Sequence, residues 1–177
     1  MKIYYTEITD RSGSDTVRAL LRRALWLEYG MAMPEILKSP GGKPYFAGGN
    51  IHFSLSHTKT HVMAAVASSP CGCDIETVRP VNPAVIRRML TEREQAELYR
   101  DDDFFKYWCL KESLYKLLDG TDMRRAEFHI LGDRAVYFGN PELKFFVYTD
   151  IDGTAAACCG AEDAGAPVHI DPEDLIY

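Results

Sequence analysis

Two segments of the sequence carry acidic residues whose spacing could hold a divalent cation. Asp74 and Glu76 are separated by one residue, and Glu112 follows much later in the chain. In an extended strand alternate residues share a face, so Asp74 and Glu76 would present two carboxylates together. Mg²⁺ takes oxygen ligands and is usually held by a few carboxylates together with substrate phosphates. Glu112, on a predicted helix facing the strand, could add a third ligand, since crowded carboxylates repel one another unless a cation lies between them.

Each segment also has a simpler interpretation. Glu112 and Lys116 lie four residues apart on the predicted helix, and alone they would form a solvated ion pair that contributes a few tenths of a kcal/mol. Asp74 and Glu76 could be charges that keep an edge strand soluble. An Asp-x-Glu pair is therefore a weak signal, and the chemistry depends on whether the segments meet.

The first half of the chain predicts a strand, a helix and a hairpin. Ser14 or Asp15 can cap the helix, and apolar residues recur along it at helical spacing. The first hairpin strand alternates strictly between apolar and polar residues, which is typical of a half-buried strand. The predicted elements are a strand at 2–8, a helix at 14–29 and hairpin strands at 51–56 and 62–67.

The second half predicts a similar order, with a long helix before an antiparallel meander. Its predicted elements are a strand at 73–76, helices at 83–90, 91–100 and 103–118, and strands at 127–130, 134–138, 143–149 and 154–159. We therefore expect an α+β fold of two similar subdomains, each a small antiparallel sheet packed on a long helix. The N-terminal half would be residues 1–72 and the C-terminal half residues 73–177. No linker-like tract separates the halves, so we expect one compact unit.

The composition indicates a globular protein that binds neither nucleic acid nor membrane. The chain has 177 residues, 46% hydrophobic and 26% charged, with a net charge of −6, which argues against affinity for nucleic acid. The charge is uneven: residues 1–72 carry eight Lys and Arg against five Asp and Glu, and residues 73–177 carry twelve against twenty-one. A polyanion would prefer the first half and a cation the second. We expect no signal peptide, a cytoplasmic protein, and reduced thiols for the five cysteines.

Four motifs occur in order along the chain, at 42–44 (GKP), 53–57 (FSLSH), 72–76 (GCDIE) and 108–116 (WCLKESLYK). Together they resemble the 4'-phosphopantetheinyl transferases of the larger, pseudo-dimeric, surfactin-synthetase-activating type, which activate carrier proteins of peptide and polyketide synthesis. The likeness extends from the first helix to the final DPEDL segment. It implies a pseudo-twofold monomer that binds coenzyme A between its halves. It also implies transfer of the phosphopantetheine arm of coenzyme A to a serine of an apo acyl or peptidyl carrier protein, with release of 3',5'-ADP.

The resemblance assigns roles to individual residues. The Mg²⁺ ligands, with Mn²⁺ as an alternative ion, would be Asp74, Glu76 and Glu112. Residues that contact coenzyme A, on the phosphate-binding N-terminal half and across the cleft, would be Arg18, Lys43, Ser56, His57, Asp74, Lys111 and Lys116. Catalytic residues would be Glu94, Glu112 and Lys116. His57 and Arg18 would lie near the 3'-phosphate, and Lys111 could instead extend along the apolar stripe of its helix.

The general base that takes the proton from the carrier serine is left open. Glu94 matches the glutamate of the family on the helix after the metal strand. The segment Thr91–Glu94 also fits a capping box, in which Glu94 would only cap its helix. A water on the metal or Lys116 could serve as the base instead.

Two other functions and one docking surface follow from the same residues. A two-metal nuclease would need a lysine two residues after Glu76, where Val78 stands. A coenzyme A or nucleotide-binding module without turnover is the alternative that is not an enzyme. The carrier protein could dock on the basic and apolar cluster Arg87, Arg88, Met89 and Leu90, although this cluster could equally be surface arginines above core residues.

Overall fold

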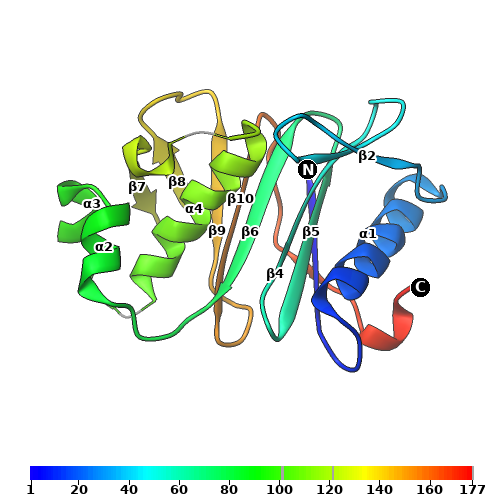
Figure 1. Ribbon diagram of the computed structural model, residues 1–177, viewed down its shortest axis with the longest axis horizontal. Helices are drawn as coiled ribbons and strands as arrows, with labels where there is room; N and C mark the ends of the chain where they lie inside the picture. Colours follow the sequence, from blue (N-terminus) through cyan, green and yellow to red (C-terminus); the bar gives the residue numbers. More distant parts are fainter. Residues whose placement is uncertain (101, 121, 177) are drawn as a thin grey trace.

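Two sheets lie face to face between two long helices in the computed structural model, which describes residues 1–100, 102–120 and 122–176. Helix α1 covers the outer face of one sheet and helix α4 covers the outer face of the other (Figure 1). The α+β fold class predicted from the sequence is confirmed. No helix in the described residues is long and apolar enough to cross a membrane.

The first sheet and α1 come mainly from the start of the chain. The strand order is β11-β1-β5-β4, antiparallel except for the β1–β11 pair. The elements are β1 (Lys2–Glu7), α1 (Gly13–Tyr29), β4 (His52–His57), β5 (His61–Ala67) and β11 (Val168–His169). The cap of α1 is Ser12, whose hydroxyl accepts the Asp15 N–H, so the predicted cap at Ser14 or Asp15 was wrong by two or three residues.

The second sheet is antiparallel throughout, in the order β6-β10-β9-β8-β7. Its strands are β6 (Cys71–Thr77), β7 (Phe128–Leu131), β8 (Arg134–Tyr137), β9 (Lys144–Tyr148) and β10 (Thr154–Gly160). The helices around it are α2 (Pro83–Met89), α3 (Glu92–Ala96), α4 (Asp103–Leu117) and the 3₁₀ turn η1 (Met123–Arg125). Helix α3 ends well before the predicted residue 100.

The two halves repeat one topology. In the first, β1 leads into α1, and the last strand β5 pairs with both β1 and its hairpin partner β4. In the second, β6 leads towards α4, and the last strand β10 pairs with both β6 and β9. This repeat agrees with the two similar subdomains predicted from the sequence.

The boundary between the halves at residues 72 and 73 remains a prediction, and two strands do not follow it. Strand β6 begins at Cys71, and β11 near the C-terminus joins the first sheet. The sequence did not predict β11, the ribbon of β2 (Ile36–Lys38) and β3 (Pro44–Phe46), or the 3₁₀ turn η2 (Pro172–Asp174).

Alternation along the strands separates three cores. On β5, Val62, Ala64 and Val66 face α1, whereas Met63 and Ala65 face the second sheet. The layer between the sheets also holds Cys71, Cys73 and Cys158. All five cysteines are buried and unpaired, as free thiols that pack like small hydrophobic side chains.

Strand β6 passes very close to α4 at Gly72. A Cβ atom built on Gly72 would lie 1.9 Å from the carbonyl oxygen of Ser113 and 3.0 Å from the amide nitrogen of Leu117. Both atoms belong to the α4 backbone, so no side-chain movement could relieve the clash. This contact sets the separation of the strand that carries Asp74 from the helix that carries Glu112.

Replacing Gly72 by Ala should therefore push α4 away from β6 and destabilise the fold by about 1–3 kcal/mol, as overpacking does. The change would be measured as the free energy of unfolding in urea. The control is Gly165→Ala, where nothing lies within 4 Å of the added Cβ. Equal stability of the two variants would show that the close approach does not constrain the fold.

Candidate active site

Asp74 lies on β6, on the face turned towards α4, and its two carboxylate oxygens have different surroundings. Oδ1 accepts hydrogen bonds from the Ser56 hydroxyl at 2.7 Å and from the Lys116 ammonium at 2.8 Å. Oδ2 is buried and has no hydrogen-bond partner. A buried carboxylate oxygen left unpaired is costly, so Oδ2 is suited to a ligand that supplies positive charge.

All three donors of the Lys116 ammonium are bonded to acceptors of the chain itself. Besides Asp74, it donates to the carbonyl oxygens of Leu55 at 3.2 Å and Cys73 at 3.0 Å. An ammonium has three donors, so none remains for a phosphate in this arrangement. Burial alone would lower the pKa of Lys116, but the charge of Asp74 raises it above its ordinary value. Lys116 is thus a cation that ties β4 to β6, which makes it a poor proton acceptor.

Glu112 on α4 is the carboxylate without a protein partner: in the described chain it makes no hydrogen bond or ion pair. Burial raises its pKa, and the charge of Asp74 raises it further, as does the weaker effect of Glu76, while Lys116 acts in the opposite direction. Glu112 is therefore within electrostatic reach of both other predicted metal ligands. Glu76, in contrast, has its Oε2 atom 3.2 Å from the guanidinium of Arg79.

The three carboxylates share one region but do not form a closed ligand cluster. Among the described residues, no group of three Asp, Glu, His or Cys side chains is gathered closely enough to hold a metal ion as it stands. Lys116 and Ser56 occupy one oxygen of Asp74, and Arg79 occupies Glu76. The unpartnered Oδ2 of Asp74 and the half-buried Glu112 nevertheless fit a divalent cation, because the first is a free acceptor and the second is a carboxylate whose pKa is raised by burial and by the charge of Asp74.

Side chains, not backbone pairing, join the two sheets next to this site. The Ser54 hydroxyl accepts the Cys73 N–H at 3.0 Å, and the Cys73 thiol donates to the Ser54 carbonyl at 3.2 Å. Ser54 and Ser56 belong to the polar face of β4, and both are buried against β6. Sequence reasoning missed Ser54, although the strict alternation of β4 placed it beside Ser56.

Lys43 lies close to Lys116 but caps a helix. Its ammonium donates to the Leu117 carbonyl at 3.1 Å and the Cys71 carbonyl at 3.4 Å, so it neutralises the C-terminal end of α4. A mainly apolar cavity of about 210 Å³ lies beside both lysines, between the 41–44 loop, β4 and α4. The structure therefore brings Lys43 and Lys116 to one cavity, where both ammonium groups bind protein carbonyls.

His57 and Arg18 lie at the other end of the first sheet. The His57 ring packs against Gly13 at the start of α1, where an added Cβ would lie 2.5 Å from Cδ2 of the ring. Both His57 and Arg18 are exposed, so an anion could reach them.

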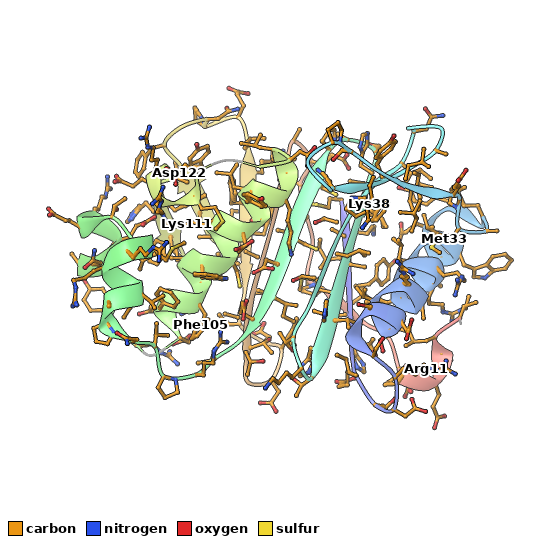
Figure 2. The ribbon with its side chains drawn as sticks, in the orientation of Figure 1. Arg11, Met33, Lys38, Phe105, Lys111 and Asp122 are labelled. Atoms are coloured by element: carbon orange, nitrogen blue, oxygen red, sulfur yellow. The ribbon has the colours of Figure 1, made fainter. Side chains whose placement is uncertain are left out.

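Glu94 and Lys111 form a buried ion pair away from the carboxylate site. Their charged groups lie 2.9 Å apart, and their side chains are 0% and 1% exposed. Glu94 also accepts the backbone N–H groups of Thr91 and Phe128, the first completing the predicted capping box. Figure 2 shows Lys111 on the side of α4 turned away from the first sheet, where it also bonds the Ala126 carbonyl.

The burial of these two residues bears on the roles predicted for them. A carboxylate with no exposed surface and both oxygens bonded cannot reach a carrier serine, so the structure favours Glu94 as a cap over Glu94 as a base. Lys111 is 1% exposed, so in this arrangement its ammonium offers no surface to coenzyme A and does not extend to solvent. Burial lowers the pKa of Lys111, and Glu94 opposes that shift.

The predicted docking cluster divides into two layers. Arg87 and Arg88 are exposed on α2, whereas Leu90 is 4% exposed in the core under α4 and Met89 packs against that core. Leu90 is therefore removed from the docking surface, because a buried side chain has no contact area to offer.

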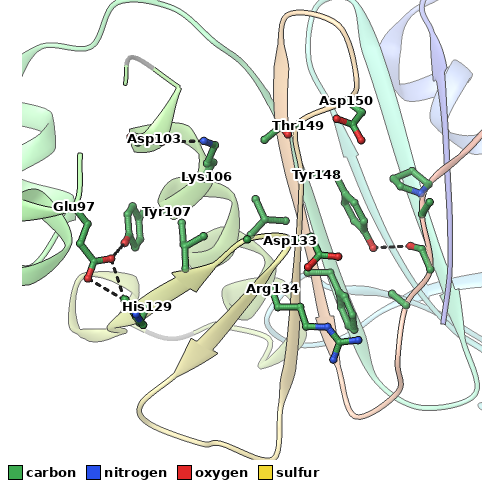
Figure 3. A pocket seen from close by; sticks show the side chains of 18 of the residues that line it. Glu97, Asp103, Lys106, Tyr107, His129, Asp133, Arg134, Tyr148, Thr149 and Asp150 are labelled. Atoms are coloured by element: carbon green, nitrogen blue, oxygen red, sulfur yellow. Dashed lines mark hydrogen bonds and ion pairs between the residues drawn. The ribbon is translucent and has the colours of Figure 1, made fainter. Parts of the chain in front are cut away.

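A separate, larger cavity lies elsewhere in the described chain. It measures about 880 Å³ and lies between the start of α4 and strands β7 to β9 (Figure 3). Glu97 lines it and accepts hydrogen bonds from Tyr107 and His129. None of the residues predicted for the site lines this cavity, so it is separate from the carboxylate region.

Breaking the Glu94–Lys111 pair should destabilise the protein strongly. Lys111→Met leaves a buried charge unpaired and should cost about 3–5 kcal/mol. Glu94→Gln should likewise destabilise, but the double variant should lose less than the sum because neither charge is then left alone. Urea unfolding of all four proteins measures the coupling, and strictly additive losses would contradict a direct pair.

Glu112 should reduce stability at neutral pH when divalent cations are absent. The pKa of Glu112 is higher in the folded state than in the unfolded state. Its contribution to the free energy of unfolding is therefore fully present below the unfolded pKa, and it is lost as the pH rises through the folded pKa and the half-buried carboxylate becomes charged. Glu112→Gln should therefore raise the melting temperature in a chelator at pH 7, and this gain should vanish near pH 4. Glu142→Gln, at an exposed position, is the control. A gain that is independent of pH would contradict the electrostatic cause.

Comparisons with known proteins place these residues in a family. The family model of the 4'-phosphopantetheinyl transferase superfamily matches residues 70–159, which include Asp74, Glu76 and Glu112. The 4'-phosphopantetheinyl transferase psf-1 of Bacillus pumilus is 31% identical over 107 residues, 55% of this chain and 46% of its own. The 4'-phosphopantetheinyl transferase Sfp of Bacillus subtilis (strain 168) is 29% identical over 126 residues, 65% and 54% of the two chains.

Among solved structures, the holo-[acyl-carrier-protein] synthase (AcpS) of Thermotoga maritima matches with a TM-score of 0.42 and 20% identity. That match covers 51% of this chain and 61% of the other, too partial a likeness to bear on the site. The chain spans about half the length of the curated relatives it matches. Since the family model covers half of the chain and the segments that carry the three carboxylates, this chain belongs to the 4'-phosphopantetheinyl transferase superfamily.

Proposed function

We propose that the chain transfers the 4'-phosphopantetheine arm of coenzyme A to a serine of an apo carrier protein, with Mg²⁺ or Mn²⁺ and with release of 3',5'-ADP. The observation that carries this proposal is the unpartnered, buried Oδ2 of Asp74 beside Glu112, a carboxylate with a raised pKa and no partner in the described chain. Relatives with transferase names support it, although the chain spans only about half of their length.

Asp74, Glu76 and Glu112 would hold the cation. When bound, it would neutralise charge on the pyrophosphate of coenzyme A as the bond to the departing 3',5'-ADP breaks. The chain prepares this site by orienting Asp74: Ser56 and Lys116 hold Oδ1, which leaves Oδ2 available to the cation. The mainly apolar cavity beside Lys43 and Lys116 would hold a less polar part of coenzyme A. His57 and Arg18 are exposed and could contact its 3'-phosphate.

Three candidates for the base that takes the proton from the serine follow from the sequence: Glu94, Lys116 and a water on the cation. Glu94 is buried in an ion pair, and Lys116 is held as a cation because its pKa is raised, so neither is suited to accept a proton. A water on the cation that Asp74, Glu76 and Glu112 would hold is the candidate that remains. The carrier would approach over α2, where Arg87 and Arg88 are exposed and could attract an acidic surface of the carrier.

The proposal is tested by incubating the protein with coenzyme A, Mg²⁺ and several apo carrier proteins and weighing the intact carriers by mass spectrometry. A carrier should gain one phosphopantetheine arm. Glu112→Gln should slow this by about 10²–10⁴-fold, because a cation that loses a ligand stabilises the transition state less, whereas Glu142→Gln should keep the rate. In the same assay, Arg87→Glu with Arg88→Glu should lower kcat/KM for the carrier and leave the KM for coenzyme A unchanged.

Binding of coenzyme A with no gain of mass on any carrier would contradict the transferase function and favour a binding module. An unchanged kcat/KM in the doubly reversed variant would remove Arg87 and Arg88 from the carrier surface.

A further inference from the structure

Arg79 gives Glu76 a positively charged partner within the chain. The Arg79 guanidinium lies 3.2 Å from Oε2 of Glu76 and also donates to the Thr77 carbonyl at 2.8 Å. Its central carbon lies 5.0 Å from the centre of the Phe105 ring on α4, within the range of a cation–π contact. The carbonyl and the ring hold the guanidinium in place independently of Glu76.

The two internal cations of the site are held with different strengths. Lys116 donates to Asp74 and to two backbone carbonyls across the joint between the sheets, so moving it would break three hydrogen bonds. Arg79 is 59% exposed and Glu76 is 28% exposed, and an ion pair this open to water contributes little. A divalent cation can therefore displace Arg79 from Glu76 far more easily than it can displace Lys116 from Asp74.

Arg79 and a divalent cation would both be attracted to the negative charge of Glu76. With Glu76 turned to Arg79, the described residues contain no cluster of three metal-ligating groups. If Glu76 turned away from Arg79, it could join Oδ2 of Asp74 and Glu112 on the same side of β6. Arg79 would remain anchored by Thr77 and Phe105 if Glu76 turned to the cation.

We propose that Arg79 is a resident counter-ion that competes with the divalent cation for Glu76 and so sets the cation concentration at which the site fills. This inference rests on the cation site of the proposed function but not on the transfer reaction. Arg79 is a positioning residue: it acts through Glu76. It also lowers the mutual repulsion of the three carboxylates while no cation is bound.

The test is a titration with Mn²⁺ alone, without coenzyme A or carrier, following the loss of the free Mn²⁺ signal by electron paramagnetic resonance. At low ionic strength Arg79→Gln should bind Mn²⁺ about two- to five-fold more tightly, the range that the strength of an exposed ion pair allows. Arg79→Lys keeps the charge and should stay near the wild type. The gain should shrink as salt is added, because salt screens the competing charge.

The matched control is Arg93→Gln. Arg93 is 51% exposed, lies 4.6 Å from the centre of the Phe138 ring and pairs with Glu127 at 3.7 Å and Glu97 at 3.9 Å, so like Arg79 it is an exposed arginine on an aromatic ring with an acidic partner, but it lies away from the site. This variant changes the net charge equally and should leave Mn²⁺ affinity unchanged. In a Glu76→Gln background, Arg79→Gln should no longer tighten binding.

Equal Mn²⁺ affinities for Arg79→Gln and Arg93→Gln would overturn the proposal, as would a gain that persists in the Glu76→Gln background. Absence of Mn²⁺ binding by the wild type would overturn both the cation site and this inference. Tighter binding by Arg79→Gln in a protein that modifies no carrier would support the counter-ion role while the transferase function fails, so the two failures are distinguishable.

Discussion

The Lys116 ammonium is the contact on which the arrangement of the site depends. It bonds one carbonyl from β4, one from β6 and one oxygen of Asp74, so a single charged group joins both sheets and orients the carboxylate. Because Oδ1 of Asp74 is taken in this way, its other oxygen is left buried without a partner. This asymmetry suits Asp74 to the proposed role of a cation ligand, because one of its oxygens is free while the other forms an ion pair.

The repeated topology explains why both halves are needed. Each half ends in a strand that returns to pair with its first strand, which leaves β4 and β6 at the edges of their sheets. Hydroxyl groups of Ser54 and Ser56 span these edges and reach Cys73 and Asp74. Strands β4 and β6 are joined by side chains and not by a ladder of backbone hydrogen bonds. The cavity next to Lys43 and Lys116 lies beside β4. The second half supplies the carboxylates, and the first half fixes how one of them points.

Periodicity predicted much of this arrangement, because it determines faces. The alternation of β4, the helix at 103–118 and the shared face of Asp74 and Glu76 all follow from spacing, and the structure contains each of them. Spacing does not determine what a long side chain contacts. Lys111 and Lys116 lie on one helix, yet one is buried against Glu94 and the other crosses to β4. Arg79 was missed for a related reason: it follows β6 in a loop, where no periodicity indicates its partner.

The buried pair on α3 and α4 bears on the charge of the site although it lies outside it. Lys111 and Glu112 are adjacent in sequence, but neighbouring side chains on a helix point in different directions. Glu94 holds Lys111 in the core on the other side of α4, so that cation is withdrawn from the carboxylates. Lys116 is committed to Asp74 and Arg79 to Glu76, which leaves Glu112 without a protein partner in the described chain. In the proposed reaction, a divalent cation that binds with a phosphorylated substrate would balance this remaining negative charge.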